Sequence, residues 1–244
     1  MNIIGDIHGD WQRYFHICKS LPDGSIQIGD HGQGFKNDAT YCDESLLKRN
    51  HLFFQGNHDS PEQCRQQANF LGSVGYRAPV FWIGGGFSID KCLRRPGISW
   101  WEDEQLTEAQ RKYALELYEV IKPKFVLSHD APTMAARAVL EPLLTREALI
   151  GGANPGYVQA KLAGVGQSVL SAVMQQMLEI HAPERWYFGH FHTSKNFMLS
   201  GYRTQFTCVN IMEVVQAPFE FENESFLAIA PDGTPYGRDA QPEI

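Results

Sequence analysis

The chain of 244 residues is long enough for one large domain, and its 43% hydrophobic and 20% charged residues are ordinary for a soluble globular protein. Its net charge of -7 argues against a sequence-independent grip on nucleic acid, although a small nucleotide is still compatible with it. No apolar run approaches the roughly 18 residues that a membrane-spanning helix needs, so we expect no contact with a membrane.

The first part of the chain alternates strands and helices. Trp11, Tyr14, Phe15 and Cys18 have the spacing of one helical face, and Asp10 before them is suited to cap that helix. Strands are expected at residues 1–4, 25–28 and 51–55, and helices at residues 11–21, 38–50 and from 60 onward. This alternation predicts a parallel sheet with helices on its faces.

The middle of the chain continues in the same way. Strands are expected at residues 80–83, 125–127 and 185–188, and helices at residues 107–121, after 132 and at 168–181. Thr107 and Gln110 form a capping box for the first of these helices. A long loop at 89–104 and an irregular glycine-rich stretch at 151–156 interrupt the pattern, and loops of that kind often carry function.

The last part of the chain contains β-like segments separated by turn residues. These segments are expected at residues 197–199, 202–209, 212–215 and 226–230. We expect them to be antiparallel strands that close a second sheet against the first. Residues 231–244 are expected to be a peripheral tail, and because no linker or repeat divides the chain, residues 1–244 are expected to form a single domain.

Residues that can bind metals follow five of the expected strands. In chain order these are Asp6 and His8, Asp30, Asn57 and His58, His129, and His190 and His192. Ligands of open α/β sheets bind outside the carboxyl ends of the strands, so these side chains should converge. Imidazoles combined with carboxylate and amide oxygens suit Mn, Fe or Zn better than Ca. Each piece alone could be a polar turn, but five such turns are improbable by chance.

The five blocks G-D-I-H-G, G-D, G-N-H-D, S-H-D and G-H-F-H resemble the calcineurin-like metallophosphoesterase superfamily over residues 3 to about 192. The resemblance implies an α/β fold: a four-layer α/β/β/α sandwich of two mixed sheets flanked by helices, with a dinuclear metal centre at the carboxyl ends of the strands. By the same resemblance, Asp6, His8 and His192 would bind one ion. The set Asn57, His129 and His190 would bind the second, and Asp30 would bridge both.

The activity that the resemblance implies is phosphoester hydrolysis by a hydroxide held between two divalent ions, with Mn²⁺ preferred over Fe or Zn. His58 would protonate the leaving oxygen or stabilise the transition state. The substrate would be a small-molecule or nucleotide-like phosphoester, with monoesters and diesters equally acceptable. Protein phosphatases of this superfamily carry G-D-x-x-D-R-G after the second block, whereas here Gln33 and Gly34 replace the Asp and the Arg. A protein substrate is therefore in doubt.

A second series is Gly84-Gly85-Gly86-Phe87-Ser88-Ile89-Asp90, then Arg94, Ser99-Trp100-Trp101 and Glu104. It is similar to a bacterial and phage branch of the superfamily whose substrates are poorly known. Arg94 could replace the missing phosphate clamp, and Trp100 could stack on a base or ring of the substrate. Alternatively, Asp90 and Arg94 pair to brace the loop, and the tryptophans pack on the sheet.

Two other functions remain open. A nuclease of the same fold is disfavoured by the acidic charge and by the lack of a stripe rich in Lys and Arg. A non-enzymatic, metal-dependent binding scaffold is disfavoured because every ligand position and His58 are filled. The sequence leaves the oligomeric state undetermined.

A cytoplasmic location is expected. The five cysteines are scattered and form no CxxC pair, so we expect reduced thiols and no disulfide framework. Residues of metal-binding type begin at Asp6, so residues 1–4 must already be a strand. A secretory signal peptide would need a basic start and an apolar stretch ahead of the domain, and we expect none.

Overall fold

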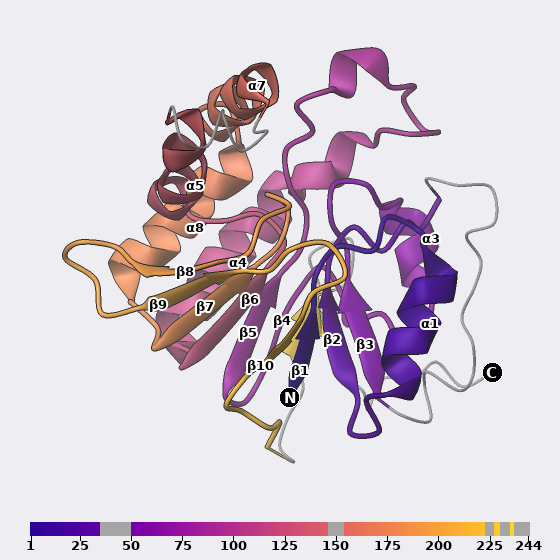
Figure 1. Cartoon of the computed structure of the whole chain (residues 1–244). Coiled ribbons are helices and arrows are strands. Elements are labelled where there is room, and N and C mark those ends of the chain that lie inside the picture. Colours follow the sequence, from indigo (N-terminus) through magenta and orange to yellow (C-terminus); the bar gives the residue numbers. More distant parts are fainter. Residues whose placement is uncertain (35–49, 146–153, 223–226, 230–234, 237–244) are drawn as a thin grey trace.

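The computed structural model describes residues 1–34, 50–145, 154–222, 227–229 and 235–236. Residues 38–49 of the helix expected at 38–50, and most of the expected tail at 231–244, lie outside these residues. Within them the chain is α/β, with two mixed sheets flanked by helices (Figure 1). None of the described helices combines the length and the apolar character needed to cross a membrane.

The first sheet has four strands in the order β10-β1-β2-β3. β1, β2 and β3 run parallel, as the alternating pattern predicts, and β10 runs antiparallel to β1. The bounds are β1 Asn2–Ile4, β2 Ser25–Ile28, β3 His51–Phe54 and β10 Val214–Gln216. β1 and β2 therefore place Asp6 and Asp30 at the same edge of this sheet.

The second sheet has eight strands in the order β12-β11-β4-β5-β6-β7-β9-β8. β5, β6, β7 and β9 run parallel, and β4, β8 and the β11–β12 pair are joined to them antiparallel. The bounds are β4 Val74–Arg77, β5 Val80–Ile83, β6 Phe125–Ser128, β7 Arg185–Phe188, β8 Lys195–Met198, β9 Gln205–Cys208, β11 Leu227–Ile229 and β12 Pro235–Tyr236.

The expectation that the C-terminal segments form an antiparallel second sheet is wrong in two respects. β9 inserts between β7 and β8 and runs parallel to β7, and β10 joins the first sheet instead of the second. The reason is that β8 takes the outer edge, so the returning strand pairs with both β8 and β7. The strand β4 was not expected, and β12 shows that residues 235–236 of the expected tail pair at the edge of the sheet.

The helices begin where the capping residues predict. Asp10 caps α1 and Ser60 caps α3, while Thr107 and Gln110 form the capping box of α4. α7 was not expected, although Asn154 before Pro155 is a recognisable start signal. The bounds are α1 Trp11–Lys19, α3 Pro61–Arg65, α4 Glu108–Ile121, α5 Thr133–Leu140, α7 Pro155–Val165 and α8 Val169–Ile180, with the 3₁₀ turns η1 Lys91–Leu93, η2 Glu102–Gln105 and η3 Glu141–Leu144.

Three apolar clusters hold these elements together. One joins the facing sides of the two sheets, with Ile26 and Phe54 from the first sheet and Trp82 and Leu127 from the second. Another packs α4, α5, α7 and α8 against the second sheet, and a third packs α1 beside β1. Because the first cluster packs the two sheets against each other, the carboxyl ends of their strands lie in fixed positions relative to one another. This packing positions the candidate site at the strand ends.

Candidate metal centre

The seven residues expected to bind metal lie at the carboxyl ends of strands from both sheets. Asp6 and His8 follow β1, Asp30 follows β2, Asn57 follows β3, His129 follows β6, and His190 and His192 follow β7. The described residues include one group of acidic and histidine side chains suited to a metal ion. It consists of Asp6, His8, Asp30 and His192, whose ligand atoms all lie within 4.8 Å of one another.

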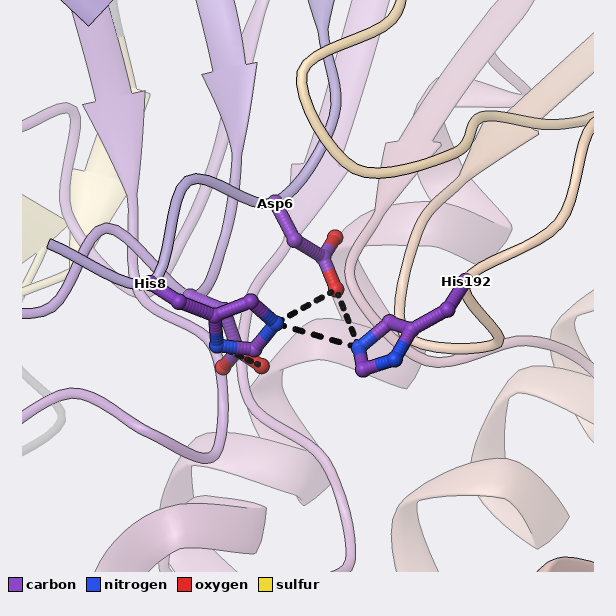
Figure 2. A group of neighbouring side chains, drawn as sticks. Asp6, His8 and His192 are labelled. Carbon is purple, nitrogen blue, oxygen red and sulfur yellow. Dashed lines mark hydrogen bonds and ion pairs between the residues drawn. The ribbon is translucent and has the colours of Figure 1, made fainter. Parts of the chain in front are cut away.

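The Asp6 carboxylate lies between the rings of His8 and His192 (Figure 2). Its Oδ2 atom is 3.3 Å from His192 Nε2 and 3.8 Å from His8 Nε2, and the two Nε2 atoms are 3.1 Å apart. Three ligand atoms therefore point at one small space. The other carboxylate oxygen of Asp6, Oδ1, accepts a hydrogen bond from the backbone N–H of His190 and orients the group.

The two carboxylate oxygens of Asp30 face different neighbours. Oδ2 is 3.7 Å from His8 Nδ1, while Oδ1 is 3.2 Å from His129 Nε2 and accepts from the backbone N–H of His58 at 2.8 Å. Burial would raise the pKa of Asp30, but the nearby charges of His129 and His58 bring this pKa well below its usual value. Asp30 is thus an ionised carboxylate with one oxygen toward each group of expected ligands.

His129 and Asn57 lie together on the Oδ1 side of Asp30. His129 Nδ1 donates to the carbonyl oxygen of Ile28, which leaves Nε2 to face Asn57 Oδ1 at 3.0 Å. Burial lowers the pKa of His129, but the Asp30 and Asp6 carboxylates raise it to about 9. A cation bound at Nε2 would replace that proton, because imidazole coordinates metals through a free lone pair.

The ring nitrogen Nε2 of His190, another expected ligand, faces a lysine. Its ring lies edge-on to that of His129, with the centroids 5.0 Å apart, and its Nε2 atom is 3.3 Å from Nζ of Lys161. Burial and the charge of Lys161 bring the pKa of His190 well below its usual value. Lys161 is a site residue that the sequence analysis did not identify, because a single Lys on a helix gives no signal.

The backbone at the ligands is unusual. His8, Asp30, His190 and His192 have positive φ angles of 47°, 54°, 65° and 53°. Non-glycine residues rarely adopt this region, which costs on the order of 1–3 kcal/mol at each position, and such strain clusters at functional sites. Hydrogen bonds hold the turns in place: the N–H groups of Ile7 and His8 both donate to the carbonyl oxygen of Asp30.

Asp59 joins the loops that follow β2 and β3. Its buried carboxylate accepts four backbone hydrogen bonds, from the N–H groups of His31, Gly32, Gln33 and Gly56. Burial and the charge of Asp30 raise the pKa of Asp59 to about 6. Asp59 therefore positions the loop of Asp30 relative to the residues after β3.

The series that begins at Gly84 also supports the site. Glu104 Oε2 accepts from the Ser88 hydroxyl at 2.6 Å, and Ser88 Oγ accepts from Asn57 Nδ2 at 3.0 Å. The amide of Asn57 is thereby oriented with its oxygen toward His129. Burial raises the pKa of Glu104, whereas its two hydrogen bonds with Ser88 lower it. Ser88 and Glu104 were visible in the sequence as parts of a motif, but their role was not.

Arg94 lies beside His58 and contacts three groups. Its guanidinium donates to His58 Nε2 at 2.8 Å, to Asp90 Oδ1 at 2.8 Å and to the carbonyl oxygen of Ser99 at 3.3 Å. Burial lowers the pKa of His58 to about 4. The charge of Arg94 also lowers this pKa, whereas the Asp30 carboxylate raises it. The expected Asp90–Arg94 pair is therefore present, and the same Arg reaches the site.

A cavity of about 320 Å³ opens beside these residues. Its lining includes His8, Asn57, His58, Arg94 and His192, together with Phe87, Ile89, Asp90, Tyr157 and Lys161. Trp100 is half-buried and is not among the lining residues, so its expected stacking on a substrate stays a prediction without support here. Gln33, which replaces the Asp of the protein-phosphatase pattern, donates to His31 Nδ1.

The residues fit a divalent cation. Oδ2 of Asp6 and Oδ2 of Asp30 are buried and have no hydrogen-bond partner among the described residues. Buried carboxylate oxygens are normally hydrogen-bonded or coordinate metals, so these two atoms are suited to bind a cation. The surrounding donors are imidazole nitrogens, carboxylates and an amide oxygen, the set that Mn, Fe or Zn accepts.

Fold and site together define an α/β protein with a candidate metal centre at the carboxyl ends of strands from two sheets. Comparison with protein-family models and with curated proteins found no match to the chain. The geometry of the candidate metal centre is therefore the main indication of its function.

Proposed function

We propose that the protein is a dinuclear metal-dependent phosphoesterase with the four-layer α/β/β/α sandwich of the calcineurin-like metallophosphoesterases. The observation that carries the proposal is the position of Asp30, whose Oδ2 faces the group of Asp6, His8 and His192 and whose Oδ1 faces His129 beside Asn57. A carboxylate in that position can bind one ion through each oxygen. His190 would complete the second ligand set.

Two divalent ions, with Mn²⁺ the preferred metal, would supply Lewis-acid sites for the phosphoryl oxygens and lower the pKa of a shared water. The chain supplies the remaining functions. Arg94 lines the cavity next to His58 and can hold a non-bridging phosphoryl oxygen. Ser88 and Asp59 keep Asn57 and Asp30 in place for the metals.

His58 is the proposed general acid. Its Nε2 atom accepts from Arg94, which is always protonated, so this nitrogen carries no proton in the described arrangement. A phosphoryl group in the cavity competes for the guanidinium of Arg94. Once Arg94 turns to the phosphate, His58 Nε2 can take up a proton from solvent, favoured by the Asp30 carboxylate, and pass it to the leaving oxygen.

A cytoplasmic location goes with this proposal. The cysteines that the structure describes, Cys18, Cys64, Cys92 and Cys208, are free thiols, which fits a reducing compartment. A small substrate fits as well, because a cavity of about 320 Å³ is at the small end of ligand sites.

The test measures hydrolysis of p-nitrophenyl phosphate and bis-p-nitrophenyl phosphate with added Mn²⁺. We expect turnover of at least one ester, and we expect Asp30→Asn to lower kcat by about a hundredfold or more, the scale of losing electrostatic stabilisation of the transition state. Asp23→Asn, in an exposed turn, is the matched control and should leave the rate unchanged. Circular dichroism checks that both variants fold.

Absence of turnover on both esters, in protein shown to bind two metal ions per chain, would contradict the phosphoesterase proposal. Wild-type rates in the Asp30→Asn variant would contradict the bridging role of Asp30. Cleavage of single-stranded DNA at near-physiological salt, in place of the small esters, would favour a nuclease instead.

A further inference from the structure

Lys161 is a buried cation in the wall of the cavity. Its side chain comes from α7, is 7% exposed, and its Nζ atom donates to the carbonyl oxygen of His190 at 3.0 Å. Among the described residues, no carboxylate oxygen lies within 4.0 Å of this ammonium group. Burial lowers the pKa of Lys161, while the more distant carboxylates of Asp30 and Asp6 raise it. A buried charge without an opposite partner is costly unless a ligand supplies that partner.

The other cation of the cavity is differently placed. Arg94 comes from the segment between η1 and η2 and is paired with Asp90 at 2.8 Å. The α7 helix and the segment after β5 pack against each other where Gly164 contacts Phe87 and Ile89, because a Cβ at Gly164 would come within 2.6 Å of Ile89. Both lie beyond the carboxyl ends of the strands (Figure 1). Lys161 and Arg94 thus reach one cavity from two separate elements.

We propose that Lys161 binds the phosphoryl group of the substrate and makes the site selective for small phosphomonoesters over diesters. The inference rests on the proposed phosphoesterase function. A monoester carries close to two negative charges near neutral pH, whereas a diester carries one. Arg94 can hold one phosphoryl oxygen but shares its charge with Asp90, so Lys161 is the cavity cation that can bind the additional anionic oxygen.

The apolar side of the cavity agrees with a small substrate. Phe87, Ile89 and Tyr157 also line the cavity, and Tyr157 is 41% exposed. The leaving group would lie against these side chains, because the cations Arg94 and Lys161 attract the phosphoryl group. The volume of about 320 Å³ is at the small end of ligand sites, which favours a small leaving group.

The experiment compares p-nitrophenyl phosphate with methyl p-nitrophenyl phosphate, a diester with the same leaving group, on the Mn²⁺-loaded protein. Lys161→Gln removes the charge but keeps a donor for the His190 carbonyl oxygen, and Lys161→Arg keeps the charge. We expect Lys161→Gln to lower kcat/KM for the monoester about tenfold to a hundredfold, the loss of one charge-assisted hydrogen bond. The fall for the diester should be at least about tenfold smaller. Lys161→Arg should recover part of the preference, and Lys112→Met, on the exposed face of α4, is the control.

A second readout does not depend on turnover. Inorganic phosphate is titrated calorimetrically into Mn²⁺-loaded protein from which free metal has been removed. The affinity for phosphate should fall about tenfold in Lys161→Gln and remain in Lys161→Arg. Equal losses on both esters, or unchanged phosphate binding in Lys161→Gln, would overturn the role of Lys161. If wild-type protein with two bound metals hydrolyses neither ester, the phosphoesterase proposal fails, and the phosphate titration still decides whether Lys161 binds the anion.

Discussion

At the scale of single residues, the site depends on how each ligand atom is oriented. Asn57 shows this most clearly, because an amide offers a metal its oxygen but not its nitrogen. The Nδ2 group donates to Ser88 Oγ, and the Ser88 hydroxyl donates to Glu104. This chain of hydrogen bonds leaves Oδ1 toward His129 and the Asp30 side of the centre. Groups behind the ligands commonly set metal affinity in this way.

Replacing Ser88 with Ala tests that orientation. We expect the affinity for Mn²⁺ to fall about tenfold to a hundredfold, because the Asn57 amide loses the acceptor that sets its direction. Calorimetric titration of the metal-free protein with Mn²⁺ measures the change. Ser20→Ala, at an exposed position after α1, is the control. An affinity equal to the wild type in Ser88→Ala would refute the orienting role.

The sequence predicted which residues gather but not how they are held. Asp6, His8, Asp30 and His192 could be named because they follow strands, and strand ends meet at one edge. The positive φ angles of His8, Asp30 and His192 depend on loops packed by distant parts of the chain, and so does the contact of Arg94 with His58. Lys161 has no neighbouring motif, so its place in the cavity could come only from the position of α7.

At the scale of elements, glycines let the strand ends approach the ligands. A Cβ on Gly189 would overlap Asp6 Oδ1, although the φ angle of Gly189 is not in the left-handed region. The requirement is therefore for space and not for backbone freedom. β7 can carry His190 next to the Asp6 carboxylate only if the residue between them has no side chain.

Gly189→Ala should displace Asp6 and weaken Mn²⁺ binding by about tenfold or more, the scale for a misplaced metal ligand. The backbone itself can accommodate alanine, so the secondary structure should be retained. Gly166→Ala, at the end of α7 where φ is -69° and the nearest atom is 3.5 Å away, is the matched control. Metal affinity can be followed by the same titration. Undiminished binding in Gly189→Ala would show that Asp6 is not a ligand.

Glu104, in the 3₁₀ turn η2, has a shifted pKa that makes the free energy of unfolding depend on pH. Burial raises the pKa of Glu104 in the folded protein above its value in the unfolded chain. Above the unfolded value of about 4.3, the folded state therefore holds a proton that the unfolded state has lost. The free energy of unfolding should then fall as the pH rises through the folded pKa.

Urea unfolding of metal-free protein at a series of pH values tests this dependence. Glu104→Gln should remove the part of the slope that Glu104 contributes, whereas Glu102→Gln, exposed on the same turn, should keep the wild-type slope. The comparison uses only the slope, which does not depend on a constant difference in stability between the variants. Parallel pH profiles for the wild type and Glu104→Gln would contradict the raised pKa.

The topology of the elements was only partly predictable. Alternating strands and helices gave the parallel arrangement of β1, β2 and β3, and capping residues gave the starts of α1 and α4. The placement of β9 and β10 could not be predicted, because the sequence of a short strand does not specify which strands it pairs with. Pairing of β10 with β1 joins segments more than 200 residues apart.

At the scale of the whole molecule, the candidate centre lies where two sheets meet. Asp6, His8, Asp30 and Asn57 come from the first sheet, and the histidines after β6 and β7 come from the second. The apolar cluster between the sheets maintains their relation without metal. Bound ions would add a second connection between the sheets, and any ion that binds the folded state alone stabilises it.

The central claim is that two ions bind on either side of Asp30. Anomalous diffraction from crystals of the Mn²⁺-loaded protein locates such ions without reference to activity. We predict two peaks separated by about 3.5–4 Å, one beside Asp6, His8 and His192 and one beside Asn57, His129 and His190. A single peak, or peaks away from Asp30, would contradict a dinuclear centre bridged by this residue.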